Sequence, residues 1–233
     1  MSEQLSFSGF PKQLISFFQN LDENNTKEWF QEHRSDYETF ILNPARAFVM
    51  DFGVKLRQLI PTIMAIPQVN KSLFRINRDI RFSKDKRPYK TNLGIWFWDD
   101  KMGVRMEGSG VYIHYENEKV FIATGMYMFT KEYKEAFRQK LQNKKKAEIL
   151  YIYLQELQKD DNYTIQGKHY KKIPRGYETN QYNEELLKFN GLGASYEPGN
   201  IPPEFHTADF IDFSLEKVKR MLPLLDWIEE LKS

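Results

Sequence analysis

Cysteine is absent from the 233 residues of this chain. Its absence excludes disulfide bonds, thiolate nucleophiles and thiolate zinc sites, and it fits a reducing compartment. Long apolar runs are also missing, since no stretch approaches the roughly 18 residues that a membrane helix needs. The first residues, MSEQLSFSGFPKQ, lack the charged start and apolar run of a signal peptide. We therefore expect a cytoplasmic protein with no membrane partner.

Recognisable catalytic motifs are missing as well. The sequence has no phosphate-cradling glycine loop, no nucleophile elbow and no dinucleotide fingerprint. Its four histidines show no ligand spacing, such as two on one helical turn. We therefore expect neither a metal site nor a bound cofactor. Carboxylates are plentiful, but no pair stands out as an acid and a base. Catalytic residues, a reaction type and an oligomeric state cannot be assigned from the sequence.

The composition is that of an ordinary globular protein. Hydrophobic residues make up 41 % of the chain and charged residues 28 %, and the formal net charge is only +2. The length suits one domain covering residues 1–233. The aromatic content of 15 % is high, which predicts a core and crevices rich in rings.

The first sixty residues carry three helical patterns. Apolar residues in the segment 7–21 recur at helical spacing. Asn25 and Glu28 have the spacing of a capping box, which predicts the start of a second helix. That helix should stop at Pro44, because the residue before a proline avoids the helical region. Pro44 itself can start a third helix that ends near residue 60.

The middle of the chain predicts an antiparallel sheet. The run NLGIWFW (92–98) is rich in residues that favour strands, and the segments 111–115 and 119–124 are joined by a connection of hairpin length. Further helices are expected at 131–141, 147–157 and 214–231, the last kinked or restarted at Pro223. In the polar segment 160–203 we expect helix only at 184–189. The predicted fold is α+β: N-terminal helices, a central antiparallel sheet with a hairpin, and C-terminal helices.

The distinctive feature of the sequence is the segment 71–90. It contains eight cations and two anions, a local charge of +6 against +2 for the whole chain. The rest of the chain therefore sums to −4. Positive charge is concentrated in one place, which favours a site for an anion.

The residue types in this segment suit phosphate and carboxylate. Guanidinium groups bind both in a bidentate manner, and arginines spaced by three can converge. Backbone N–H groups of the turn before Pro88 could add donors. The expected anion-binding residues are Arg75, Arg78, Arg81, Ser83, Lys84, Lys86, Tyr89 and Lys90. The expected supporting residues are Asp79, Asp85 and Trp29, with Asp79 orienting an arginine.

The order of residues in this segment resembles the signature of a family of uncharacterised proteins, a domain of unknown function. The run from Arg75 to Lys90 has the pattern RxxRDxRFSxDKxPYK. The pattern NNxxEWF from Asn24 and the pattern PxGY from Pro174 are similar to other parts of that family. The resemblance covers nearly the whole chain. It implies a single α+β domain, and it implies no activity.

Three functions remain open. The first, which we take as the best interpretation, is binding of a phosphorylated or carboxylated small molecule at an Arg/Lys-rich pocket, with catalysis on it left open. The second is a nucleic-acid binding module that stacks bases on Trp96, Phe97, Trp98 and Tyr112, although the small net charge argues against it. The third is structural: arginines paired with acids and buried beneath the aromatic strand, with no ligand.

Overall fold

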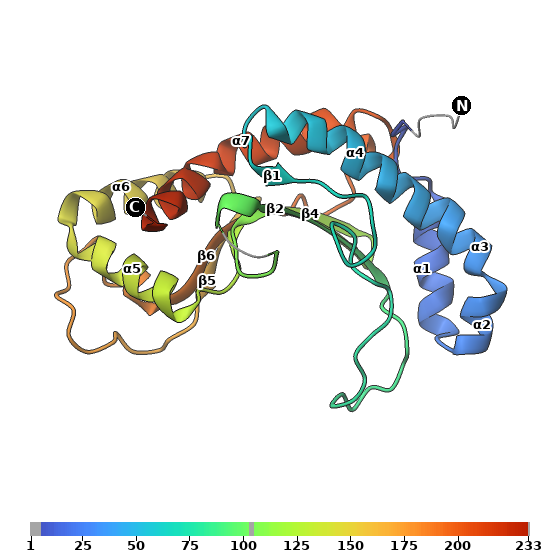
Figure 1. Ribbon diagram of the computed structural model, residues 1–233, viewed down its shortest axis with the longest axis horizontal. Coiled ribbons are helices and arrows are strands. Elements are labelled where there is room, and N and C mark those ends of the chain that lie inside the picture. Colours follow the sequence, from blue (N-terminus) through green and yellow to red (C-terminus); the bar gives the residue numbers. More distant parts are fainter. Residues whose placement is uncertain (1–5, 103–104, 233) are drawn as a thin grey trace. The chain divides into compact units, whose positions relative to one another are not determined.

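A computed structural model describes residues 6–102 and 105–232 (Figure 1). The predicted α+β class is confirmed: helices come first, an antiparallel sheet occupies the middle, and a long helix closes the chain. The helices are α1 (Gln13–Glu23), α2 (Lys27–Glu32), α3 (Arg34–Tyr37), α4 (Asn43–Arg57), α5 (Lys131–Gln142), α6 (Lys144–Leu157) and α7 (Phe210–Glu229). The strands are β1 (Ile63–Met64), β2 (Asn92–Asp99), β3 (Gly110–Glu116), β4 (Lys119–Met126), β5 (Tyr163–Lys168) and β6 (Phe189–Tyr196). Among these helices, none combines the length and the apolar character needed to cross a membrane.

The six strands form one sheet in the order β1-β2-β3-β4-β6-β5. Strand β6 pairs antiparallel with both β4 and β5. The predicted hairpin is confirmed: β3 and β4 are joined by Asn117 and Glu118, whose φ angles are 49° and 57°. Two successive residues with positive φ are typical of the type I′ turn, whose twist matches that of paired strands.

The described residues divide into two compact units. Unit 1 takes its residues from Met1–Phe97, Tyr112–Phe121 and Pro198–Leu215, and unit 2 from Trp98–Val111, Ile122–Glu197 and Glu216–Ser233. The prediction of one domain covering the chain stays a prediction. The basic segment 71–90 belongs entirely to unit 1.

The core of unit 1 is built from rings on α4 and the sheet. Phe48 and Phe52 of α4 contact Phe97 of β2, with ring centroids 6.4 and 5.2 Å apart. All three side chains are fully buried. Helix α4 therefore covers the face of the sheet that carries Phe97. Because side chains alternate along a strand, the residues on either side of Phe97 point to the opposite face.

The predicted capping box of the second helix is wrong. The residue at the helix start is Thr26, whose side-chain oxygen accepts a hydrogen bond from the backbone N–H of Trp29 at 3.2 Å. Thr26 has the extended backbone that a capping residue requires. Asn25 and Thr26 are both residue types that can cap a helix. Thr26 takes this role, and the side chain of Asn25 binds the backbone of Tyr89 instead.

The predicted stop of the second helix at Pro44 is also wrong in detail. Helix α2 ends at Glu32, α3 follows, and a π-helical turn (Glu38–Leu42) leads directly into α4 at Asn43. Pro44 lies in the first turn of α4, where proline is common because its fixed φ suits a helix. The third helix therefore begins next to Pro44, as predicted, but the second helix does not extend to this proline.

In unit 2, strands β5 and β6 lie in the segment that the sequence predicts to be mostly irregular. The helix expected at 184–189 is only a short 3-10 turn, Leu186–Lys188. The glycines of β6 interrupt the sequence pattern that is typical of a strand. They are nevertheless needed where another backbone lies close, because a Cβ at Gly191 would lie 2.2 Å from the backbone oxygen of Tyr127. The helices expected on either side, α5, α6 and α7, are confirmed, and α7 runs through Pro223 without restarting.

Candidate anion-binding site

Residues 76–90 form an irregular hairpin, which we call the basic hairpin. Asn77 and Tyr89 make an antiparallel bridge. Around this bridge, the N–H of Arg78 donates to the oxygen of Pro88 and the N–H of Lys90 donates to the oxygen of Ile76, both at 2.8 Å. In Figure 1 the hairpin is the teal loop that extends away from the neighbouring helices and strands. Its tip is open to solvent, since Phe82 is 94 % exposed.

Two arginines of the basic hairpin are paired with its own aspartates. Arg81 binds Asp79 through two bonds, Nη2 to Oδ2 at 2.7 Å and Nε to Oδ1 at 3.0 Å. These bonds lower the pKa of Asp79 to about 2. Arg78 binds Asp85 at 2.5 Å. Asp79 therefore contacts an arginine, as expected, while its role in supporting an anion site stays a prediction.

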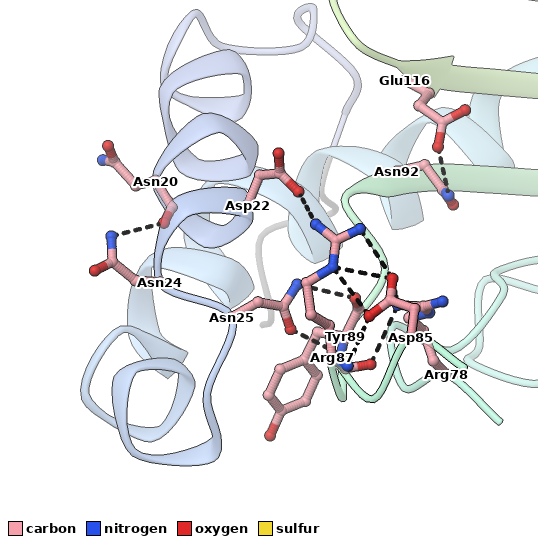
Figure 2. Close-up of polar contacts among 10 residues, drawn as sticks. All are labelled: Asn20, Asp22, Asn24, Asn25, Arg78, Asp85, Arg87, Tyr89, Asn92 and Glu116. Carbon is pink, nitrogen blue, oxygen red and sulfur yellow. Dashed lines mark hydrogen bonds and ion pairs between the residues drawn. The ribbon is translucent and has the colours of Figure 1, made fainter. Parts of the chain in front are cut away.

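The third arginine ties the basic hairpin to the end of α1 (Figure 2). Arg87 binds Asp22 at 2.5 Å and Asp85 at 3.0 Å. Hydrogen bonds from Arg87 and Arg78 lower the pKa of Asp85 well below its ordinary range. One carboxylate thus holds two guanidinium groups from opposite sides of the hairpin.

A second anchor joins the hairpin to the chain after α1. The side-chain amide of Asn25 donates to the backbone oxygen of Tyr89 and accepts from its N–H, both at 3.0 Å (Figure 2). The ring of Tyr89 then stacks on Phe30 with centroids 4.2 Å apart. Tyr89, expected to bind an anion, is thus used in packing and backbone anchoring.

The ion pairs of the hairpin lie at the surface. The side chains of Arg78 and Asp85 are 26 % and 37 % exposed, and that of Arg81 is 76 % exposed. The buried network of the structural hypothesis therefore does not form. Surface pairs add little to stability, so we expect their main effect to be on the shape of the hairpin.

Four further expected residues make no contact with a common group among the described residues. Lys86 donates to the backbone oxygen of Ile80 at 3.0 Å. Ser83 and Lys84 lie at the tip, and in the part of the chain that is described no hydrogen bond joins either to another side chain. Trp29 stacks on His33 of the same helical region, with centroids 4.0 Å apart.

Arg75 and Lys90 lie at the base of the hairpin and differ from the other cations. Over residues 6–102 and 105–232, neither makes an ion pair with an acid, although the charge of Arg75 also acts on Asp79. Burial and the positive charge of Arg75 lower the pKa of Lys90. The ammonium of Lys90 lies 5.6 Å from the centre of the Phe74 ring. Lys90 is therefore partly desolvated and has an exposed like charge, Arg75, as a neighbour.

Beside them lies the sheet face opposite α4, where the side chains are half-buried. Along β3, Ile113 and Tyr115 are buried, while Tyr112, His114 and Glu116 alternate with them and point to this other face. The Tyr112 hydroxyl lies 2.9 Å from Nδ1 of His114, and Nε2 of His114 lies 3.6 Å from Glu116. The three polar groups therefore form one chain along the strand.

Burial on this face favours the neutral forms of His114 and Tyr112. Burial lowers the pKa of His114, and the charge of Lys90 adds to the effect while Glu116 opposes it. Burial and the carboxylate of Glu116 raise the pKa of Tyr112 to about 12. The Tyr112 ring needs Gly94 on β2, because a Cβ there would lie 2.6 Å from its oxygen.

Sequence reasoning missed His114 and Glu116 as members of a site. Their spacing from Tyr112, two and four residues along a predicted strand, is the signal that could have found them. Of the four residues expected to stack bases in a nucleic-acid module, two lie together on this face, and their binding of a base stays a prediction. Trp96 and Tyr112 share one face, with ring centroids 6.5 Å apart. Phe97 and Trp98 are buried, because their side chains fill cores, and they cannot stack on a base.

A hollow of about 290 Å³ lies between α1 and the β3–β4 turn. Its lining includes Asp22, Glu23 and Glu118, so its charge is unsuited to an anion. Within the ranges that the structure describes, no group of three or more acidic or histidine side chains could hold a metal ion.

These features define an α+β protein with a cationic hairpin beside an aromatic sheet face. The family model described as "Conserved hypothetical protein (DUF2461)" matches residues 13–227, and the chain belongs to this family. The resemblance of the sequence to a family of uncharacterised proteins is thereby confirmed. Comparison with curated proteins and with solved structures found no match. The description of the family names no activity, so function must be argued from the site.

Proposed function

We propose that the protein binds a phosphorylated or carboxylated small molecule through Arg75 and Lys90 at the base of the basic hairpin. The observation that carries this proposal is the contrast between these two cations and the arginines of the hairpin. Arg78, Arg81 and Arg87 each bind an aspartate. Arg75 and Lys90 are neighbours without such a partner in the described residues.

A bound anion would remove an unfavourable interaction at this place. In the free protein, burial and Arg75 both disfavour the charged form of Lys90. An anion between the two groups reverses this effect, because an opposite charge nearby favours the ammonium. Partial burial also strengthens the attraction, since less water screens it. The guanidinium supplies a bidentate donor and the ammonium a point charge.

The ion pairs of the hairpin support the same proposal. They hold the two sides of the hairpin together, and Asn25 fixes its base through the backbone of Tyr89. The position of Lys90, the next residue, is thereby fixed before any ligand binds. Preorganised groups bind more tightly because less ordering is needed on binding.

The test is a calorimetric titration with inorganic phosphate and with citrate at low ionic strength. The variant Lys90→Gln removes the proposed ammonium, and Lys27→Gln removes the same charge from the exposed surface of α2 in the same unit. A charge-assisted hydrogen bond contributes about 1.5–3 kcal/mol, so Lys90→Gln should weaken binding at least about tenfold. Lys27→Gln should change it less than about twofold.

Equal losses in the two variants would mean that only net charge matters, and this would contradict a defined site. Absence of saturable binding of either anion to the wild-type protein would contradict the proposal as well. Folding is checked by thermal unfolding: Lys90→Gln should not lower Tm, because the ammonium that it removes is disfavoured in the folded protein.

A further inference from the structure

The sheet face beside Arg75 and Lys90 is covered with aromatic rings. We call this set the ring face, and its members are Phe74, Trp96, Tyr112, His114 and Phe121. The centroid of Tyr112 lies 5.8 Å from those of Phe74 and Phe121 and 6.5 Å from that of Trp96. His114 stacks on Phe121 at 4.8 Å. The rings are half-buried and form one continuous surface over neighbouring strands.

The cations and the ring face meet at one point. Lys90 lies over Phe74, the ring at the edge of this surface. Phe74 is held there because the segment before the hairpin runs beside β2, with its N–H donating to the oxygen of Gly94 at 3.1 Å. A ligand that places an anion on Lys90 can therefore place an attached flat ring on the neighbouring aromatic surface.

We propose that the ligand of this site is a nucleoside phosphate, with its phosphate on Arg75 and Lys90 and its base on the ring face. The inference rests on the proposed function. The source of the ligand is a free nucleotide or one unit of a single-stranded nucleic acid, which share this chemistry.

Two physical arguments favour this ligand over a plain phosphate or carboxylate. Antiparallel sheets that expose aromatic residues on neighbouring strands bind unpaired bases by stacking, while nearby cations bind the phosphates. The base edge would also meet polar groups, since Asn92 donates to Glu116 at 3.3 Å on the same face. An amide and a carboxylate together offer donors and acceptors that a base can use.

The experiment compares adenosine 5′-monophosphate with ribose 5-phosphate, which has the same charged group and lacks the base. Titration calorimetry of the wild-type protein should show the nucleotide binding at least about tenfold more tightly. A ten-residue oligoadenylate forms the third arm. If the oligoadenylate binds more tightly than the mononucleotide, the source is a single-stranded nucleic acid; if it binds equally or more weakly, the source is a free nucleotide. Either result supports the inference, provided that the mononucleotide binds more tightly than ribose 5-phosphate.

Substitutions of single rings test whether the base of the nucleotide binds to the ring face. Tyr112→Leu should remove most of the advantage of the nucleotide and leave ribose 5-phosphate binding within about twofold. Tyr127→Leu is the matched control, because it removes a tyrosine ring that is 87 % exposed in unit 2, and it should change neither affinity. Phe121→Leu gives the same readout at a second ring, should Tyr112→Leu fail to fold.

The outcomes separate the two proposals. Equal affinity for the nucleotide and for ribose 5-phosphate would overturn the inference and leave anion binding at Arg75 and Lys90 standing. Loss of the base advantage in Tyr127→Leu but not in Tyr112→Leu would overturn it too. If neither compound binds, both the inference and the proposed function are wrong.

Discussion

Replacing Asn25 with alanine should loosen the basic hairpin and destabilise the protein. The side chain of Asn25 makes two hydrogen bonds to the backbone of Tyr89, each 3.0 Å long and partly buried (Figure 2). These bonds connect residues 64 positions apart in the sequence. Alanine removes both bonds and leaves a backbone donor and acceptor without their partner.

The size of the effect follows from the number of bonds. A typical hydrogen bond contributes about 0.5–1.5 kcal/mol, so losing two should lower the free energy of unfolding by about 2 kcal/mol. For a chain of this size, that corresponds to a fall in Tm of about 4–8 °C. The neighbouring Asn24 provides a matched control, because its side chain makes one exposed bond, to the oxygen of Asn20. That oxygen keeps its bond from the backbone N–H of Asn24, so Asn24→Ala should lower stability by less than about 0.5 kcal/mol.

The assay is urea unfolding of the wild type and the two variants, combined with amide hydrogen exchange. Asn25→Ala should shift the urea midpoint without changing the slope, and exchange of the Tyr89 amide should become faster. Equal stability of the two variants, or unchanged protection of Tyr89 in Asn25→Ala, would refute the reasoning.

Three further predictions concern the ring face and the hairpin. Gly94→Ala should destabilise by about 1–2 kcal/mol, because its Cβ would lie 2.6 Å from the Tyr112 oxygen. Adding Tyr112→Phe should restore part of the loss in a double-mutant cycle, and purely additive effects would contradict the contact. Burial lowers the pKa of His114 in the folded protein. As the pH falls through about 6.5, the ordinary pKa of histidine, the unfolded chain therefore binds a proton at this residue before the folded protein does. The free energy of unfolding should therefore decrease as the pH is lowered below about 6.5, and urea titrations of His114→Gln should lack this part of the pH dependence. Asp85→Asn removes the carboxylate that holds two arginines, so heteronuclear NOE values across residues 79–87 should drop with little change in Tm; unchanged values would show that the ion pairs do not shape the hairpin.

Most of the fold could be predicted from local pattern. Apolar periodicity predicts α1, α4, α5, α6 and α7, and a short connection predicts the β3–β4 hairpin; the structure confirms these elements. Strands β5 and β6 could not be predicted in this way. Strand β6 carries Gly191 and Gly193, which weaken a strand pattern, and the need for them appears only when the backbone of Tyr127 lies against the strand.

The candidate site could be predicted as a region of the sequence but not residue by residue. The charge of the segment 71–90 predicts a cationic surface, and the arginines at 78 and 81 look as suitable for an anion as the arginine at 75. Which of them has an aspartate within bonding distance depends on how the hairpin folds back on itself. The bonds from Arg87 to Asp22 of α1 and from Asn25 to Tyr89 join distant parts of the sequence, and no spacing rule predicts them.

The most direct test of anion binding at Arg75 and Lys90 is a crystal structure of the protein grown in phosphate or sulfate. The account predicts an ion in contact with both the guanidinium of Arg75 and the ammonium of Lys90. An ion bound instead among Arg78, Arg81 and Lys86 of the basic hairpin, with nothing between Arg75 and Lys90, would contradict it.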